Sequence, residues 1–266
     1  MLFLQTLWEG IVNGSIYAMI AMGIALVWGV MGILSFSQGE FMMLGMFITF
    51  YANTYLGLDP VVCVPIVGLL MFGFGCVVYR TIIAKALRGP RLSQRLITFA
   101  VGMVLTYGAL MLFGGQYRTV QDLAFTGSID LAGLAISRQK LVPLIIALVM
   151  VAFMYIFLNK TMIGKAIQAT SQDKQAAELV GIDSETTYMV AFGLSSALAG
   201  IAGCAITYYF PVYYTAGAAF LLFGFIAVLL GGVGSTFGAL VGGLIMGVTD
   251  TFSGVYLNTA YKYLAV

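Results

Sequence analysis

Long apolar runs interrupted by few charges constrain this chain more than any other feature. Only 8% of its 266 residues are charged and 61% are hydrophobic, whereas a soluble domain carries about 25% charged residues. Several runs reach the roughly 20 residues that an α-helix needs to cross about 30 Å of hydrocarbon. A membrane β-barrel would instead show segments of about ten residues that alternate apolar and polar side chains. The sequence therefore predicts an all-α polytopic membrane protein.

The apolar runs predict about eight membrane segments within a single transmembrane domain over residues 1–266. The last run is too long for one crossing, and we expect it to fold as two segments. The N-terminus has no basic region and no small-residue cleavage site, so it reads as a retained first span. The seven runs cover residues 4–30, 41–55, 61–79, 96–113, 141–158, 189–209 and 220–255.

Basic residues between the runs predict the orientation. The stretch "RTIIAKALRGPRLSQR" at 80–95 has five Lys or Arg residues and no acid, which places it in the cytoplasm by the positive-inside rule. Two spans later, the loop 159–188 falls on the same side by parity. We therefore expect the N-terminus and the loop 114–140 to face outward.

A polar cluster stands inside apolar sequence in "GILSFSQGEFMMLG", residues 32–45. An acid at the bilayer centre costs about 2.5–3.5 kcal/mol on insertion scales, so it faces a cavity or a partner by default. One interpretation is a half-helix terminus that lines a path for a polar solute; the other is a tight turn, with the acid at the N-terminus of the next helix. The candidate pathway residues are Ser35, Ser37, Gln38, Gly39 and Glu40, together with Asn13 in the first run. For Asn13, hydrogen bonding between helices is the simpler explanation.

Glycines are dense in "LLGGVGSTFGALVGGLIMG", residues 229–247, with a weaker counterpart at 29–45. Such density allows close helix approach or a broken helix, and broken backbone at membrane depth survives only where protein or a water cavity satisfies it. A pair of glycine-interrupted segments points to a transport pathway. We therefore predict broken or re-entrant helices there, with a gating role for Gly231, Gly232, Gly234 and Gly238.

The loop 159–188 contains "ATSQDKQAAELVGID", which predicts a short helix outside the membrane. Thr170 and Asp173 have capping-box spacing, and Gly181 is placed to end the helix. So short a helix is not stable alone in water. It must dock either on its own membrane domain or on another protein.

Several kinds of chemistry are absent from the sequence. There is no histidine, and Gly164 with Lys165 lacks the earlier glycine and the following Ser or Thr of a phosphate-binding loop. The three cysteines lie in apolar runs without paired spacing. We therefore expect no metal site and no cofactor in this chain. A net charge of +2 gives no reason to expect a nucleic-acid partner.

Three stretches of the chain resemble the permease subunits of ABC importers for branched-chain amino acids, a family that also includes urea and short-amide importers. They are "NGSIYAMIAMGIALVWGVMGILSFSQGEFMMLGMF", "GKAIQATSQDKQAAELVGIDSETTYMVAFGLSSALAGIAG" and "IAVLLGGVGSTFGALVGGLIMG". The resemblance implies a translocation subunit in a bacterial inner membrane. Its implied partners are membrane lipid, a second related permease, an extracytoplasmic solute-binding protein and two cytoplasmic ATPase subunits that bind ATP and Mg.

The same resemblance marks residues 164–182 as a coupling helix that fits a groove on the ATPase. Its implied coupling residues are Gly164, Ala169, Asp173, Ala176, Ala177 and Gly181. Gln168 stands where an Arg is common, so no salt bridge is expected from that position. Ser37 and Gln38 replace the more usual small residue and His. Many members continue into a further span and a basic tail, so we expect a truncated terminus at Val266.

The leading functional hypothesis is a passive gate driven by a partner's ATP hydrolysis, with a branched-chain amino acid as the solute. The competing class is an ion-coupled secondary carrier or channel in which Glu40 and Asp250 bind a proton or cation. An intramembrane enzyme is the least supported of the three classes, because the sequence contains no nucleophile–base pair. The sequence leaves open the solute and whether the two permeases are identical.

Overall fold

The computed structural model describes residues 2–121, 125, 127–131 and 134–256. Its long helices are α1 (Leu2–Met31), α2 (Gln38–Leu56), α3 (Pro60–Val78), α5 (Arg91–Phe113), α6 (Arg138–Lys160), α9 (Ser184–Ile206), α10 (Ala216–Gly231) and α11 (Thr236–Tyr256). The short elements are the π-helix η1 (Tyr79–Ile83), α4 (Ala84–Ala86), α7 (Met162–Gln172), α8 (Lys174–Leu179) and the strands β1 (Ser128–Leu131) and β2 (Leu134–Ser137).

Six helical segments in the described part of the chain are long and apolar enough to cross a membrane, which confirms a polytopic helical protein. They are α1, α3 with its continuation through α4, α5, α6, α9 and α11. Helix α10 has 16 residues and spans about 24 Å, less than the hydrocarbon thickness. The predicted total of about eight membrane segments stays a prediction.

The long run at 220–255 divides into two helices, as predicted. The break falls between α10 and α11, where Gly232 and Gly234 have φ angles of 91° and 83°. Glycine adopts this left-handed region without the steric penalty that a Cβ brings. Most of the glycine-rich stretch 229–247 is nevertheless helical, and its glycines mainly allow close contact. A Cβ on Gly243, for example, would meet the backbone of Ala18 in α1.

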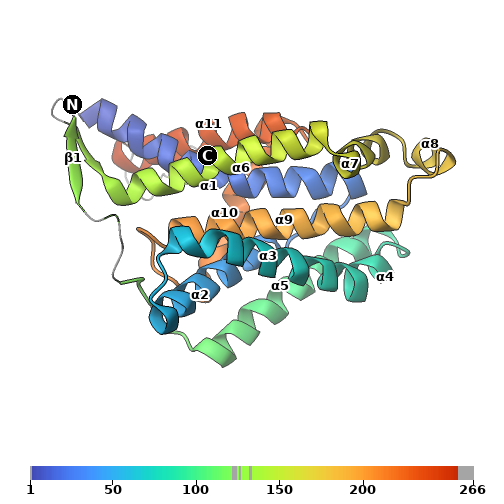
Figure 1. Cartoon of the computed structure of the whole chain (residues 1–266), viewed down its shortest axis with the longest axis horizontal. Helices are drawn as coiled ribbons and strands as arrows, with labels where there is room; N and C mark the ends of the chain where they lie inside the picture. The colour runs from blue at the N-terminus through green and yellow to red at the C-terminus, as the bar shows by residue number, and fades with distance from the viewer. Residues whose placement is uncertain (1, 122–124, 126, 132–133, 257–266) are drawn as a thin grey trace.

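Helices α1 and α9 form the centre of the molecule. Their most apolar windows are 89% and 83% buried, against 22% for α5 and 28% for α3 and α6. Small residues on α9 bring its backbone close to its neighbours: Gly200 meets Met71 of α3, and Gly203 meets the carbonyl of Met42 in α2. This close approach is typical of membrane helix packing, which lacks a hydrophobic driving force. Figure 1 shows α9 beside α3 along most of its length.

The two ends of the helix bundle carry different segments (Figure 1). The N-terminus and the β1–β2 hairpin lie at one end, and α4, α7 and α8 lie at the other. The basic stretch 80–95 and the loop 159–188 therefore share an end, as the predicted orientation requires. The hairpin pairs Ser128 with Ser137 and Leu131 with Leu134. The hairpin was not predicted from the sequence, because strands of four residues are too short to establish an alternating pattern.

Two irregular segments lead into buried helix starts. Residues 32–37 connect α1 to α2, and residues 207–215 connect α9 to α10. The second segment is packed within protein, with Tyr208 and Val212 buried, so its irregular backbone is tolerated. The two helix starts meet at Gly39 and Gly217, where a Cβ on either residue would overlap the carbonyl oxygen of the other.

Candidate functional site

A surface groove of about 310 Å³ lies where α2, α5 and α10 come together. We call it the Glu40 groove. It is lined by Glu40 of α2, by Phe99, Gly102, Met103 and Tyr107 of α5, and by Thr215 at the start of α10. Phe99, Met103 and Tyr107 are also exposed on the outer face of α5. The groove therefore opens onto a face of α5 that the described residues leave uncovered.

Glu40 stands in the first turn of α2. Its Oε2 atom is buried and has no hydrogen-bond partner among the described residues. The carboxyl packs against Gly102, since a Cβ on that glycine would lie 3.2 Å from Oε2. The ion pairs found in the described part of the chain join other residues, Lys140 with Glu9 and Lys174 with Glu178. Among the described residues, the Glu40 carboxyl group therefore has no basic partner where it lines the groove.

Ser35, Ser37 and Gln38 lie beside the groove but do not line it, and each is 0% exposed. The two serine hydroxyl oxygens are 3.2 Å apart. Helix α5 fixes this segment through Thr98, whose hydroxyl accepts from the backbone N–H of Phe36 at 3.3 Å. Both polar atoms of the Gln38 side chain are buried without a partner in the described residues. The structure therefore combines the two sequence interpretations: a turn places Glu40 at a helix start, and that start faces a cavity.

Asn13 lies apart from the Glu40 groove. Its Nδ2 donates to Thr251 Oγ1 at 3.3 Å, and its Oδ1 accepts from the hydroxyl of Tyr209 at 3.2 Å. These bonds join α1, α11 and the segment 207–215, so they match the simpler explanation of hydrogen bonding between helices. Asp250 is similarly placed in α11, where its Oδ2 accepts from Tyr17 at 3.0 Å.

The four proposed gating glycines gather at the turn between α10 and α11, and none of them lines the Glu40 groove. The backbones of Gly231 and Gly238 are in direct contact. Gly234 contacts the end of α1, where a Cβ on Gly29 would lie 2.8 Å from its Cα. The glycines thus permit a tight turn, and their gating role stays a prediction.

The loop 159–188 forms two helices, α7 and α8, and one predicted cap is wrong. Asp173, and not Thr170, caps α8: its Oδ1 accepts from the N–H groups of Gln175 at 2.9 Å and Ala176 at 3.1 Å. Thr170 is buried within α7 instead. Gly181 ends the loop helix with a φ of 88°, as predicted. The sequence did not reveal that Asp173 separates two helices, because Ala176 stands three residues after it where a capping box has Glu or Gln.

The implied coupling residues point in different directions. Gly164 packs on Leu158, and Ala177 is only 3% exposed, so both face their own chain. Ala169 is half-buried, whereas Asp173, Ala176 and Gly181 are exposed. Within residues 164–182, the exposed large apolar side chains are Leu179 and Val180, 88% and 78% exposed. They form an apolar tip at the end of α8.

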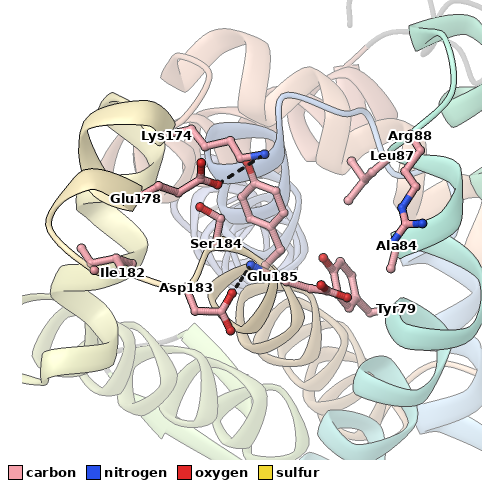
Figure 2. A pocket seen from close by; sticks show the side chains of 12 residues that line it. Tyr79, Ala84, Leu87, Arg88, Lys174, Glu178, Ile182, Asp183, Ser184 and Glu185 are labelled. Carbon is pink, nitrogen blue, oxygen red and sulfur yellow. Dashed lines mark hydrogen bonds and ion pairs between the residues drawn. The ribbon is translucent and has the colours of Figure 1, made fainter.

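A pocket of about 580 Å³ lies between α8 and the basic stretch (Figure 2), and no pattern in the sequence predicted it. Tyr79, Ala84 and Arg88 line one side; Lys174 and Glu178 of α8 line the other, 3.7 Å apart as an ion pair. π-helical turns such as η1 on the first side often occur at functional sites.

Asp183 lies at the base of the pocket and caps α9. Its Oδ1 accepts from the N–H of Glu185 at 3.0 Å, and its Oδ2 accepts from the hydroxyl of Thr186 at 2.5 Å. The Thr186 hydroxyl, followed by the Glu185 N–H, lowers the pKa of the Asp183 carboxyl. The ionised form therefore stabilises the start of α9.

Comparison with known proteins identifies the family. The model described as "Branched-chain amino acid transport system / permease component" matches residues 6–265. The high-affinity branched-chain amino acid transport system permease protein LivH of Salmonella typhimurium is 31% identical over 98% of this chain and 89% of its own length. BraD of Pseudomonas aeruginosa is 30% identical with the same coverage. LivM of Escherichia coli is 26% identical over 88% of this chain and 60% of its own length. This chain therefore belongs to the family of branched-chain amino acid transport system permeases.

Proposed function

We propose that this chain is the translocation subunit of an ATP-driven importer and that a branched-chain amino acid passes through the Glu40 groove. The names of LivH and BraD support the solute class. The observation that carries the pathway is the Oε2 atom of Glu40, which is buried beside an open groove without a partner among the described residues. Such a group within the membrane costs free energy unless it binds a solute or contacts a partner.

A second permease completes the pathway in this proposal. The Glu40 groove opens on the face of α5, which exposes large apolar side chains such as Val104 and Met111. Lipid on this face would leave the Glu40 carboxyl against hydrocarbon, whereas a second protein wall would enclose a polar path. The similarity of this chain to both LivH and LivM supports a pair of related permeases.

Two ATPase subunits drive the cycle from the end that carries α4, α7 and α8. The tip formed by Leu179 and Val180 is the apolar contact for the ATPase, and the pocket behind it leaves room for α8 to move against α4. ATP and Mg bind to those partners. A solute-binding protein delivers the amino acid at the opposite end, and α2 and α10 complete eight membrane segments in the bilayer.

The test is transport by a reconstituted complex. The two permeases and their ATPases are placed in proteoliposomes with ATP on the ATPase side, and the binding protein with radiolabelled leucine is added on the other. We expect leucine uptake that requires ATP and disappears with ATPase subunits that cannot hydrolyse it. Uptake that instead follows an imposed proton or sodium gradient would favour the ion-coupled carrier.

A further inference from the structure

We infer that the Glu40 groove recognises the charged backbone of an α-amino acid, with Glu40 binding the ammonium group. The inference rests on the proposed role of the groove as a translocation path. It adds the chemical class that the path selects: zwitterions with an alkyl side chain, rather than urea or neutral amides.

The Glu40 carboxyl supplies the first element of recognition. None of the ion pairs in the described residues involves it, and its Oε2 atom is buried against Gly102 without a hydrogen-bond donor. An uncompensated charge in such a place destabilises the protein. An ammonium group carries three N–H donors and a full positive charge, so it satisfies the carboxylate in a way that a neutral amide does not.

The start of α10 supplies the second element, on the adjoining wall. Thr215 is the N-cap of this 16-residue helix, and no side chain caps its first turn. The N–H groups of Ala216 and Ala218 donate to the carbonyls of Tyr213 and Thr215, so it is the positive dipole end of the helix that favours an anion such as a carboxylate. The two walls are in contact, because a Cβ on Gly217 would lie 3.0 Å from the backbone nitrogen of Glu40. One groove therefore presents a negative group and a helix N-terminus to the same ligand, together with the hydroxyl-bearing residues Tyr214 and Thr215.

Apolar walls supply the third element. Phe36, Phe99, Met103 and Leu221 line the rest of the groove, and the rings of Phe36 and Phe99 meet edge to face with centroids 6.5 Å apart. A volume of about 310 Å³ is at the small end of the range for small-molecule sites. The surfaces match a compact alkyl side chain. Urea has no alkyl group to contact these walls and no positive charge to pair with Glu40.

The experiment measures protection of a cysteine in the groove of the assembled permease–ATPase complex. Cys63, Cys76 and Cys204 are replaced by serine, and Met103→Cys places a thiol in the groove. The rate of labelling by a methanethiosulfonate reagent is measured with leucine, with 4-methylpentanoate, which lacks the ammonium group, and with urea. We expect leucine to slow labelling in a saturable way, 4-methylpentanoate to protect at least about ten-fold more weakly, equivalent to about 1.4 kcal/mol, and urea to give no protection.

Glu40→Gln keeps the size of the side chain and removes its charge. We expect it to raise the leucine concentration for half-protection at least about ten-fold, while the matched control Glu9→Gln, at the outer end of α1, leaves it unchanged. Equal protection by leucine and 4-methylpentanoate, or unchanged protection in Glu40→Gln, would overturn the inference. The comparison of leucine with 4-methylpentanoate keeps Glu40 unchanged. It therefore tests the inference even if the Glu40→Gln variant fails to assemble.

These outcomes are separate from those of the proposed function. Leucine uptake that requires ATP, with no dependence of protection on the ammonium group or on Glu40, would keep the importer and reject this recognition site. Leucine protection of the groove without ATP-dependent uptake would keep the site and reject the importer.

Discussion

The backbones of Gly39 and Gly217 are in direct contact, although 177 positions separate them in the chain. A Cβ on Gly39 would lie 2.8 Å from the carbonyl carbon of Gly217 and 2.9 Å from Cβ of Leu221. This contact joins the starts of α2 and α10, the two helices that carry Glu40 and Thr215. The geometry of the Glu40 groove therefore depends on having no side chain at either glycine.

We expect Gly39→Ala and Gly217→Ala to separate α2 from α10, because the obstructing atoms belong to backbone that cannot move aside. Overpacking of this kind costs about 1–3 kcal/mol. Thermal unfolding of the purified complex and leucine uptake measure the effect, and both should fall. The control is Gly73→Ala in α3, where nothing lies within 4 Å of an added Cβ. Equal unfolding temperatures and equal leucine uptake in all three variants would show that the contact between Gly39 and Gly217 is unimportant.

The apolar tip at Leu179 and Val180 should be the part of the loop that a partner covers. Leu179→Asp or Val180→Asp introduces a charge that stays hydrated in the free permease but is desolvated in a contact, at a cost of about 1–3 kcal/mol. We expect the permease to fold normally and to lose its ATPase subunits on size-exclusion chromatography.

Ala177→Asp provides the contrasting case, because Ala177 is buried against its own chain. This variant should lower the unfolding temperature of the permease itself. If Leu179→Asp and Val180→Asp retain the ATPases at the parental ratio, the tip is not the docking surface.

The cap at Asp183 predicts a pH dependence. Its pKa is lowered in the folded protein, so the stabilisation is fully present above the unfolded pKa of about 3.9 and is lost as pH falls through the folded value. Asp183→Asn should unfold at a lower temperature than the parent at neutral pH. The difference between the two unfolding temperatures should narrow as pH falls below about 4, and a constant difference would contradict the ionised cap.

The orientation can be tested with single cysteines in a background without the native ones. Tyr117 is exposed between α5 and β1, and Lys85 is exposed in α4, at the opposite end of the bundle from the β1–β2 hairpin. A membrane-impermeant thiol reagent should label Tyr117→Cys in intact cells, but Lys85→Cys only after permeabilisation. The reverse pattern would invert the orientation given by the positive-inside rule.

Hydropathy and charge in the sequence predicted the membrane class, most helix positions and the shared end of the basic stretch 80–95 and the loop 159–188. These features are local: a run of about 20 apolar residues must satisfy its own backbone as a helix wherever it lies in lipid. The division of the last run followed from its length, and the break contains Gly232 and Gly234. Resemblance in three stretches also led to the family.

Only the tertiary structure shows which helices contact one another across the bundle. Glu40, Gly102 and Thr215 come from three distant segments, and no pattern in the sequence joined them. The sequence also did not predict that Ala177 is buried and that Leu179 is exposed. The physical reason is that lipid and the protein interior are both apolar, so a membrane helix does not need a polar face to mark its exposed side. Close packing of small residues and the placement of a few polar groups select the neighbours, and these become visible only when the helices are assembled.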